Sequence, residues 1–541
     1  MAFKDLLTSL RNLSGVHTPT LALLIGTVMW WLELYVIRLP YGYTSWTAWI
    51  LLILVLGWMA YLKRTAVLCT LDEYSQRWQE QPLRIKGAMV LIGSLVLAYL
   101  SIGLYASLLP PHLTQEYDAL NYHLTLPRQH LIRHSFAHLA WSTADLYLLP
   151  LDYALSPFWL ASVWPNKFIQ FFFFIAALGG VYQIVMILSK QSRIRAAVGV
   201  LAVMACHAVA IQVGTAMLDL VMVYCFLAFV HSLLSRRWGW AVIEFTFFAW
   251  SKSFIAPQIL VIGLVLGMIV LIATKMRWGL DEMPLHEMPW RKMAIIFFIT
   301  STIIAGPQLI KSTYYSGSPL YPFAARLLPI KAEYPPDYQE AMRQRAAQCV
   351  ETKDMYGHGR SWGDLIRHWW LLAVPEKGVN NAFDYPLGLI YLLVLLPFGW
   401  NLVHTLRQRR LPVLSVMVVL WWISWWFGSQ QSRFLLIPVC FMVMLAISYL
   451  PRLTKTLIAL IVITLSLELI SLANAHRSDW GKPYTAVIRA KDIKLANTAP
   501  DTGSTVIQWD SPDVAFSPWL VDVRPSDSVF VIPYSSTATS R

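Results

Sequence analysis

Long apolar runs, separated by short polar or basic segments, dominate the chain from residue 20 to residue 472. Many of these runs approach the roughly 20 residues that a helix needs to cross a bilayer. The pattern predicts an all-α polytopic membrane protein with about thirteen transmembrane helices. We expect them at residues 20–37, 45–62, 87–109, 166–188, 196–213, 216–234, 239–251, 254–273, 293–310, 387–403, 412–428, 434–450 and 454–472.

Composition supports this class. The chain has 541 residues, of which 57% are hydrophobic and 13% are charged, whereas soluble proteins carry about 25% charged residues. Many of the 25 Trp and 24 Tyr residues fall near the ends of apolar runs, as expected at a lipid–water interface. The net charge of +13 lies mainly in short loops between apolar runs, so it indicates membrane topology and no nucleic-acid partner.

The distribution of Lys and Arg predicts the orientation. With a cytoplasmic N-terminus, every second loop is basic and cytoplasmic, and the short extracytoplasmic loops carry only Arg38, Lys252 and Arg433. The first apolar run lacks a cleavage site and is typical of an anchor. The protein is then a multi-pass protein of the cell membrane. Three long polar segments lie on the extracytoplasmic side, at 110–165, 311–386 and the C-terminal tail 473–541. Alternation at 504–508 and 528–533 predicts short strands in that tail.

The same pattern divides the chain into five parts. They are two N-terminal transmembrane helices with a basic cytoplasmic loop (1–86), a core with the first outer loop (87–310), a second outer loop (311–386), C-terminal transmembrane helices (387–472) and the extracytoplasmic tail (473–541). The five cysteines, scattered mainly among apolar segments, indicate neither a disulfide framework nor a cysteine metal site.

Two carboxylates stand at the start of the first outer loop. Glu116 and Asp118 are followed by Tyr122 and His123, and residues 118–133 are typical of a short amphipathic helix at the interface. On such a helix Asp118 and Tyr122 share a face, whereas His123 is turned aside. Apolar walls would raise the basicity of Asp118, which suits a general base. The alternative is a pair of solvated loop carboxylates.

Three further charged residues stand at the outer ends of predicted spans. Asp219 lies about one turn inside an apolar run, where an acid is costly and indicates function, unless it reaches the interface or pairs with Lys252. Lys252 and Arg433 offer cations that could bind a phosphate at the headgroup level, or could simply anchor the chain to lipid headgroups. Gly and Pro residues in 306–323 predict a rigid turn beside them.

Together these segments resemble the integral membrane glycosyltransferases of the GT-C superfamily. The types most similar are the protein O-mannosyltransferases, the lipid A aminoarabinose transferases and the rhizobial galacturonic acid transferases. The resemblance covers roughly residues 87–440, with a seven-helix core. Five strings carry it, Tyr117–Leu124, Met217–Leu220, Trp250–Phe254, Ser316–Phe323 and Gln430–Pro438. Trp250–Phe254 departs from the family's turn at its first and last residues, and Ser318 replaces an Asn.

The resemblance implies transfer of a sugar from a polyprenyl-phosphate donor to a glycan, lipid or protein acceptor outside the cytoplasmic membrane. It implies that Asp118 is the catalytic base, with Glu116 supporting it, and that Lys252 and Arg433 bind the donor phosphate. It also implies supporting roles in the site for four further residues, Tyr122, His123, Asp219 and Tyr321. Asp145 or Asp152 would supply a second acid, although both match poorly. Some relatives use a divalent metal, but the sequence shows no full ligand set, so the cofactor stays open.

Two other functions remain open. A lipid-linked sugar carrier or flippase would need the same outer cations but would not need Asp118. A polysaccharide ligase or polymerase would use Arg and His in a late outer loop. Candidates for that reaction are Arg343, Arg345, His358, Arg360 and Arg367. Walker, Rossmann and His/Glu zinc motifs are absent from the sequence.

Overall fold

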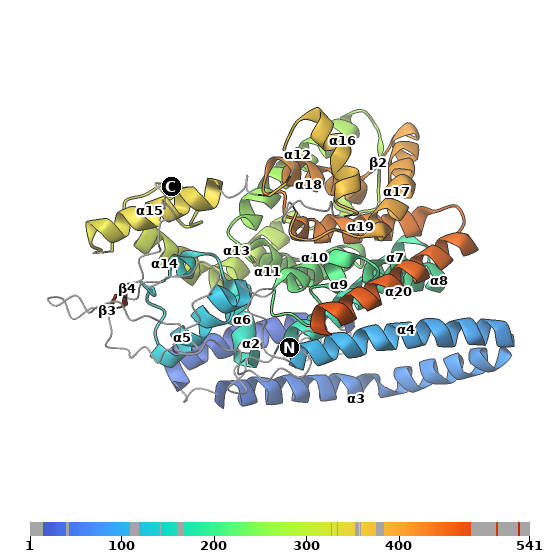
Figure 1. Cartoon of the computed structure of the whole chain (residues 1–541), viewed down its shortest axis with the longest axis horizontal. Coiled ribbons are helices and arrows are strands. Elements are labelled where there is room, and N and C mark those ends of the chain that lie inside the picture. The colour runs from blue at the N-terminus through green and yellow to red at the C-terminus, as the bar shows by residue number, and fades with distance from the viewer. Residues whose placement is uncertain are drawn as a thin grey trace, which may run out of the picture.

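Helices make up almost all of the regular structure. The computed structural model describes residues 15–38, 43–108, 118–140, 142–159, 167–325, 327–332, 334–351, 356–357, 359–374, 383–477, 505–506 and 529–530. Within these ranges the predicted helical class is confirmed, and the strands found there form two short pairs. Figure 1 shows the helices α5, α14 and α15 gathered at one end of the molecule, away from the connection between α3 and α4 at the other end.

The helices of the first half are α2 (Thr18–Leu32), α3 (Tyr43–Glu80), α4 (Leu83–Leu108), α5 (Thr125–Arg133), α6 (Pro150–Trp159), α7 (Phe168–Leu188), α8 (Arg193–Met204), α9 (His207–Ala210), α10 (Asp219–Leu234) and α11 (Trp238–Ala249). Those of the second half are α12 (Ile255–Lys275), α13 (Trp290–Ile304), α14 (Gly306–Ser316), α15 (Pro336–Glu351), α16 (Trp362–Leu371), α17 (Leu389–Arg407), α18 (Val413–Phe427), α19 (Leu436–Tyr449) and α20 (Lys455–Arg477). Shorter turns include the 3-10 helices η1 (Gly15–His17), η4 (Thr143–Leu146), η5 (Leu285–Glu287) and η7 (Ser432–Leu435), and the π-helical turns η2 (Glu33–Ile37) and η3 (Ala119–His123).

Fewer helices can cross a membrane than the sequence predicted. Seven described segments are long and apolar enough, namely Thr18–Ile37, Leu83–Leu108, Phe168–Leu188, Ile255–Lys275, Leu389–Arg407, Ser432–Tyr449 and Lys455–Asn474. The pair α13 and α14, bent by 58°, raises the number to eight if it forms one broken span. The protein is therefore a multi-pass helical protein, but the prediction of thirteen spans is wrong.

The overcount has a physical cause. The expected spans at 216–234, 239–251 and 412–428 are helices of 16, 12 and 15 residues, which are about 18 to 24 Å long. The expected span at 196–213 breaks at Cys206 into α8 and α9, whereas the expected span at 45–62 lies within the continuous helix α3. These segments are apolar partly because they are buried: nearly all of α10 lies inside the protein. The hydropathy of a segment does not show whether its apolar side chains are covered by other parts of the protein or by lipid.

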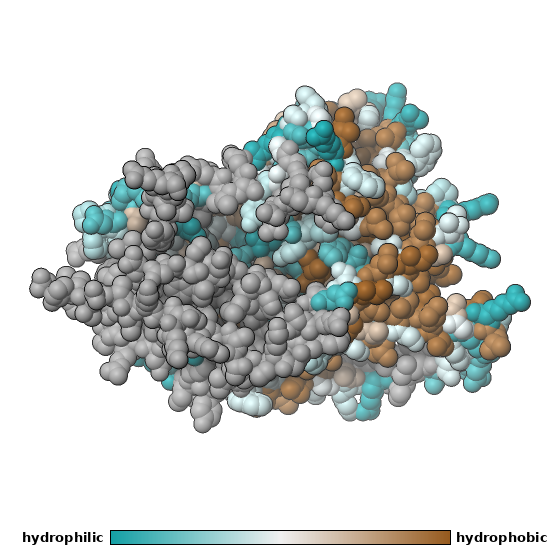
Figure 2. All heavy atoms as spheres, in the orientation of Figure 1, coloured by the Kyte–Doolittle hydropathy of each residue, from teal (hydrophilic) through white to brown (hydrophobic). Residues whose placement is uncertain are grey.

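The described helices differ in what covers them. The span containing α19 is 83% buried, and α19 packs against α7, α8, α17 and α18 at the centre of the bundle. The spans of α4 and α12 are only 11% buried and expose large apolar side chains such as Leu97 and Leu264. Figure 2 shows hydrophobic side chains gathered over the half of this face that α4, α8 and α20 occupy in Figure 1. Such a surface is suited to lipid.

Two short parallel strand pairs complete the described structure. Strand β1 (Gly279–Asp281) pairs with β2 (Arg410–Pro412), and this pairing ties the segment after α12 to the start of α18. Strand β3 (Thr505–Val506) pairs with β4 (Val529–Phe530). The latter two fall inside the segments for which strands were predicted, and the remainder of the tail lies outside the described residues.

Candidate functional site

Five charged side chains from distant parts of the sequence meet near the N-terminal ends of α10, α12 and α19. The Nη1 of Arg433 donates a hydrogen bond to Oδ2 of Asp118 at 2.8 Å, and its Nε lies 3.3 Å from Oδ2 of Asp384. The Nζ of Lys252 donates to Oδ1 of Asp219 at 2.7 Å. All five side chains are largely but not wholly buried, with 3–21% of each exposed.

One aromatic ring connects the two ion-paired groups. The Nζ of Lys252 lies 5.6 Å from the centroid of the Phe434 ring, and Cζ of Arg433 lies 5.4 Å from the same centroid. These separations allow both cations to interact with the ring. The two cations that the sequence assigned to phosphate binding therefore lie close to each other.

The turn that carries Lys252 is held at several points. The Oγ of Ser251 donates to the Phe248 carbonyl at 2.7 Å, which closes the end of α11. The indole of Trp250 donates to Oγ of Ser301 at 2.9 Å, and Oγ of Ser253 accepts from the Leu148 amide at 2.9 Å. Because these contacts fix both sides of Lys252, its ammonium has a defined position.

The turn that carries Arg433 is held in a similar way. The Oε1 of Gln431 accepts from Nε of Arg433 at 2.7 Å, while the Gln431 carbonyl accepts from the indole of Trp425 at 2.8 Å. The backbone amide and the hydroxyl of Ser432 both donate to the Phe383 carbonyl, at 2.8 and 2.6 Å. Ser432 thus joins the Arg433 turn to the segment that carries Asp384.

Asp118 immediately precedes the π-helical turn η3, in which the amide of Leu124 donates to the carbonyl of Ala119. π-Turns are rare and frequent at functional sites. His123 faces Asp152 instead of Asp118, with 2.6 Å between Nδ1 and Oδ1, and its ring lies 4.2 Å from that of Tyr122. The expected helix 118–133 is therefore a π-turn followed by α5, and Tyr122 and His123 line the Asp118 side of the cluster.

The two carboxylates that share Arg433 differ in acidity. Burial alone would raise the pKa of Asp118, but the Arg433 guanidinium and the nearby His123 and Lys252 outweigh it, and the pKa is below its usual value. The expectation of raised basicity at Asp118 is therefore wrong, because the sequence did not reveal its ion pair. Burial raises the pKa of Asp384 to about 6, although Arg433 opposes the change.

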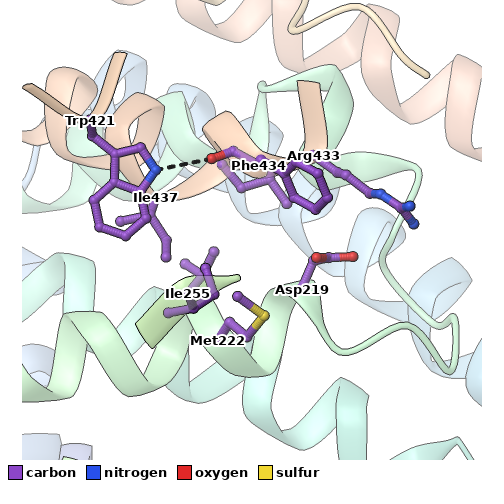
Figure 3. A pocket seen from close by; sticks show the side chains of 9 residues that line it. Asp219, Met222, Ile255, Trp421, Arg433, Phe434 and Ile437 are labelled. Atoms are coloured by element: carbon purple, nitrogen blue, oxygen red, sulfur yellow. Dashed lines mark hydrogen bonds between the residues drawn. The ribbon is translucent and has the colours of Figure 1, made fainter. Parts of the chain in front are cut away.

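A narrow pocket opens beside the cluster. Its interior has room for about one water molecule, and its lining comes from α10, α12, α18, η7 and the start of α19. Figure 3 shows Asp219 and Arg433 at one end, with the apolar Met222, Ile255, Trp421 and Ile437 extending away from them. The pocket therefore offers charge at one end and an apolar wall along the rest.

The remaining predicted residues lie in other clusters or beyond the described chain. Asp145 belongs to a buried network in which its Oδ1 accepts from Nζ of Lys311 at 2.7 Å and contacts Nε2 of His130 at 2.6 Å. Its Oδ2 contacts Nδ1 of His138 at 3.0 Å. The buried Tyr321 donates its hydroxyl to the Met342 carbonyl at 2.8 Å. Glu116 and His358 lie outside the described residues.

The sequence reasoning missed Asp384 and the network around Asp145. An acid in a long polar loop carries no signal of its own, and only the hydrogen bonds of Ser432 bring Asp384 to Arg433. In the part of the chain that the structure describes, no group of three or more His, Cys, Asp or Glu residues is placed to hold a metal ion.

The arrangement brings two cations and three carboxylates together beside a narrow pocket with a largely apolar lining. Comparison of the chain with family models, with characterised proteins and with solved structures finds no match.

Proposed function

We propose that this protein is a membrane glycosyltransferase that moves a sugar from a polyprenyl-phosphate donor to a glycan, lipid or protein acceptor. The proposal rests on one observation: Asp118, Asp219, Lys252 and Arg433 lie together, and two of them, Asp219 and Arg433, form one end of a pocket whose other lining is apolar. An isoprenoid phosphate has the same distribution of properties, an anion attached to an apolar chain. The resemblance of five sequence strings to the GT-C superfamily gives the same function. The seven-helix core that it implies is not supported, because three of the spans counted in it, 196–213, 216–234 and 239–251, are short or broken helices.

The electrostatics of the site favour an anionic headgroup. Asp219 is the first residue of α10, and Lys252 and Arg433 precede α12 and α19 by three residues each. Helix N-terminal ends carry partial positive charge and free amide groups, which stabilise anions. The phosphate would approach Lys252 and Arg433, and the first carbons of the isoprenoid would widen the narrow pocket beside Trp421 and Ile437 as they enter it.

In the proposed reaction, Asp118 removes the proton of an acceptor hydroxyl, whose oxygen attacks the anomeric carbon of the donor sugar. The bond between that carbon and the phosphate oxygen breaks, and the electron pair leaves with polyprenyl phosphate. Lys252 and Arg433 stabilise the negative charge that develops on the departing phosphate. The new product is the glycosylated acceptor, and the proton stays on Asp118 until solvent removes it.

We place this reaction on the extracytoplasmic side, with the N-terminus in the cytoplasm. The basic loops between apolar runs support this orientation. Asp118, Lys252 and Arg433 share one site, so they must lie on one side of the membrane.

The ligase or polymerase alternative has less support. Arg343 and Arg345 lie on α15, and Arg367 is exposed on α16. Arg360 donates to the carbonyls of Trp426 and Gly428. These arginines do not surround one pocket among the described residues, unlike the two cations beside Phe434.

The test compares surface glycans and glycolipids by mass spectrometry in cells with and without the protein. A difference of one sugar unit would identify the acceptor and the donor class. Asp118→Asn should abolish that difference while protein level and membrane insertion stay normal, and the exposed Asp337→Asn on α15 is the matched control. Transfer by Asp118→Asn at the level of the control would refute the base role, and a carrier would behave in that way.

A further inference from the structure

Asp384 gives the site a feature that sugar transfer alone does not explain. The three carboxylates of the cluster outnumber its two cations, so the fully ionised site has one negative charge in excess. A phosphodiester donor would add another negative charge in a largely buried place. Like charges in such surroundings repel strongly, so one carboxylate must lose its charge, or its place, when the phosphate binds.

The geometry shows which carboxylate is least firmly held. Asp118 has a hydrogen bond from Arg433 at 2.8 Å, and Asp219 has one from Lys252 at 2.7 Å. Asp384 approaches Nε of Arg433 only to 3.3 Å, and its buried Oδ2 has no hydrogen bond among the described residues. Nε instead donates to Gln431 at 2.7 Å.

The backbone of Asp384 adopts a left-handed conformation. Its φ of +67° lies in a region that is uncommon for residues other than glycine, although Asp and Asn tolerate it. Ser432 maintains this conformation from both sides, since its hydroxyl donates to the carbonyl of Phe383 and accepts from the amide of Tyr385 at 3.2 Å. Backbone strain of this kind persists where surrounding contacts enforce it, often at functional sites.

Arg433 has an open donor between the two carboxylates. Its Nη1 faces Asp118 and its Nε faces Gln431 and Asp384, whereas Nη2 has no hydrogen-bond partner in the described part of the chain. A phosphate that used Nη2 together with Nε would form the bidentate contact typical of arginine. At Nε that position is shared by the neutral Gln431 amide, at 2.7 Å, and the Asp384 carboxylate, at 3.3 Å, and of the two only the carboxylate would repel the phosphate.

We propose that Asp384 is an internal competitor for the donor phosphate: the phosphate replaces its carboxylate at Arg433, and Asp384 takes up one proton from solvent as this happens. The inference rests on the proposed function, because it assumes a phosphate-bearing donor. It makes Asp384 a positioning residue that sets the affinity for the donor and the pH range in which the donor binds.

The surroundings of Asp384 support proton uptake. The charged groups that act on it are Arg433 and Lys252, which favour its ionised form, and Asp118 and Asp219, which disfavour it. Two phenols, Tyr356 and Tyr385, also lie within its electrostatic reach. Burial is the largest influence, and with these groups it sets the pKa of Asp384 at about 6. Replacing Arg433 as its partner would raise that pKa further.

The experiment measures binding of a polyprenyl methyl phosphodiester to the purified full-length protein in lipid nanodiscs. This probe carries one charge throughout the range studied, so its own titration does not interfere. With a pKa of about 6, the dissociation constant of the wild type should rise about fifty-fold between roughly pH 6 and pH 8. Asp384→Asn, which also suits a left-handed backbone, should bind with little pH dependence and at least as tightly as the wild type at low pH.

Two controls complete the test. Asp337→Asn should keep the wild-type pH dependence, and calorimetry of the wild type in two buffers should show uptake of about one proton per bound probe at about pH 8. No proton uptake, or an Asp384→Asn variant that keeps the wild-type pH dependence, would overturn the inference while leaving the proposed function standing. Failure of the wild type to bind the probe at any pH would refute both, and Arg433→Ala should bind the probe weakly at every pH.

Discussion

Loss of the Lys311 ammonium should destabilise the protein by about 3 to 5 kcal/mol, because the group holds a buried charge network together. The side chain of Lys311 is 3% exposed and that of Asp145 is fully buried, with 2.7 Å between Nζ and Oδ1. The ammonium also lies 2.9 Å from Nε2 of His130 and 4.4 Å from the centroid of the Phe136 ring. Lys311→Met keeps an unbranched side chain about as long as the methylene part of lysine and removes the ammonium with these contacts.

The size of the expected destabilisation follows from the contacts that Asp145 keeps in the variant. In Lys311→Met the buried Asp145 keeps contacts with His130, His138 and the Leu139 amide, but it loses the only lysine in the network. An uncompensated buried charge accounts for most of the cost of breaking such a pair. The double variant Lys311→Met/Asp145→Asn removes both charges, so it should recover about 2 kcal/mol relative to the sum of the single variants.

The assay is equilibrium unfolding of the purified protein in detergent micelles, with the denaturant midpoint and slope both measured. Lys331→Met is the matched control, since Lys331 is exposed and its loss should change the free energy of unfolding by no more than about 0.5 kcal/mol. The reasoning is refuted if Lys311→Met stays within about 1 kcal/mol of the wild type. Additive effects in the double variant would also refute it.

Three further predictions follow from individual contacts. Lys252→Ala removes one of the two cations beside Phe434, so the donor concentration for half-maximal transfer should rise about 10- to 100-fold; an unchanged dependence on donor concentration would count against its phosphate role. Burial and the nearby Lys311 lower the pKa of His130, and burial lowers that of His138. Below about pH 6.5 the unfolded chain therefore binds protons that the folded histidines do not, and stability should fall by up to about 1.4 kcal/mol per pH unit for each histidine. Melting curves between about pH 7.5 and 5.5 would test this, and His138→Gln should reduce the slope. Gly317→Ala should destabilise the fold by about 1 to 3 kcal/mol, because φ is +72° and a Cβ would lie 2.1 Å from the Leu328 carbonyl oxygen; Gly239→Ala, where a Cβ meets nothing within 4 Å, should leave the melting temperature almost unchanged.

Four charged residues that the sequence singled out lie together in the structure, whereas several of the predicted spans are short or broken helices. Asp118, Asp219, Lys252 and Arg433 stood out because a charge at the end of an apolar run is costly unless it has a partner or a function. The structure brings these four together. The sequence also allowed Asp219 to pair with Lys252 as a structural alternative, and this contact is present. It does not exclude a role in binding, since an ion pair can hold a cation ready for an anion.

The predictions that failed concern helix lengths and pKa shifts that depend on tertiary contacts. Segments such as α10 and α11 are as apolar as lipid-facing spans, because the core of a helical membrane protein excludes water as lipid does. The pKa of Asp118 depends on Arg433, which is 315 residues away in sequence. No local sequence pattern could therefore predict whether that pKa is raised or lowered. Asp384 became visible only because Ser432 joins two distant segments.

The ion pair between Arg433 and Asp118 also predicts the order of events in the proposed reaction. While Arg433 holds Asp118, the pKa of that carboxyl is below its usual range, and Asp118 is a poor base. A donor phosphate that shares Arg433 weakens this hold and adds a nearby negative charge, and both changes raise the pKa of Asp118. Donor binding should therefore precede productive acceptor binding. Initial-rate kinetics with both substrates varied should show an ordered mechanism with the donor first, and Arg433→Lys, which lacks the bidentate fork, should weaken that order. Random binding with equal acceptor affinity in the presence and absence of the donor would contradict the argument.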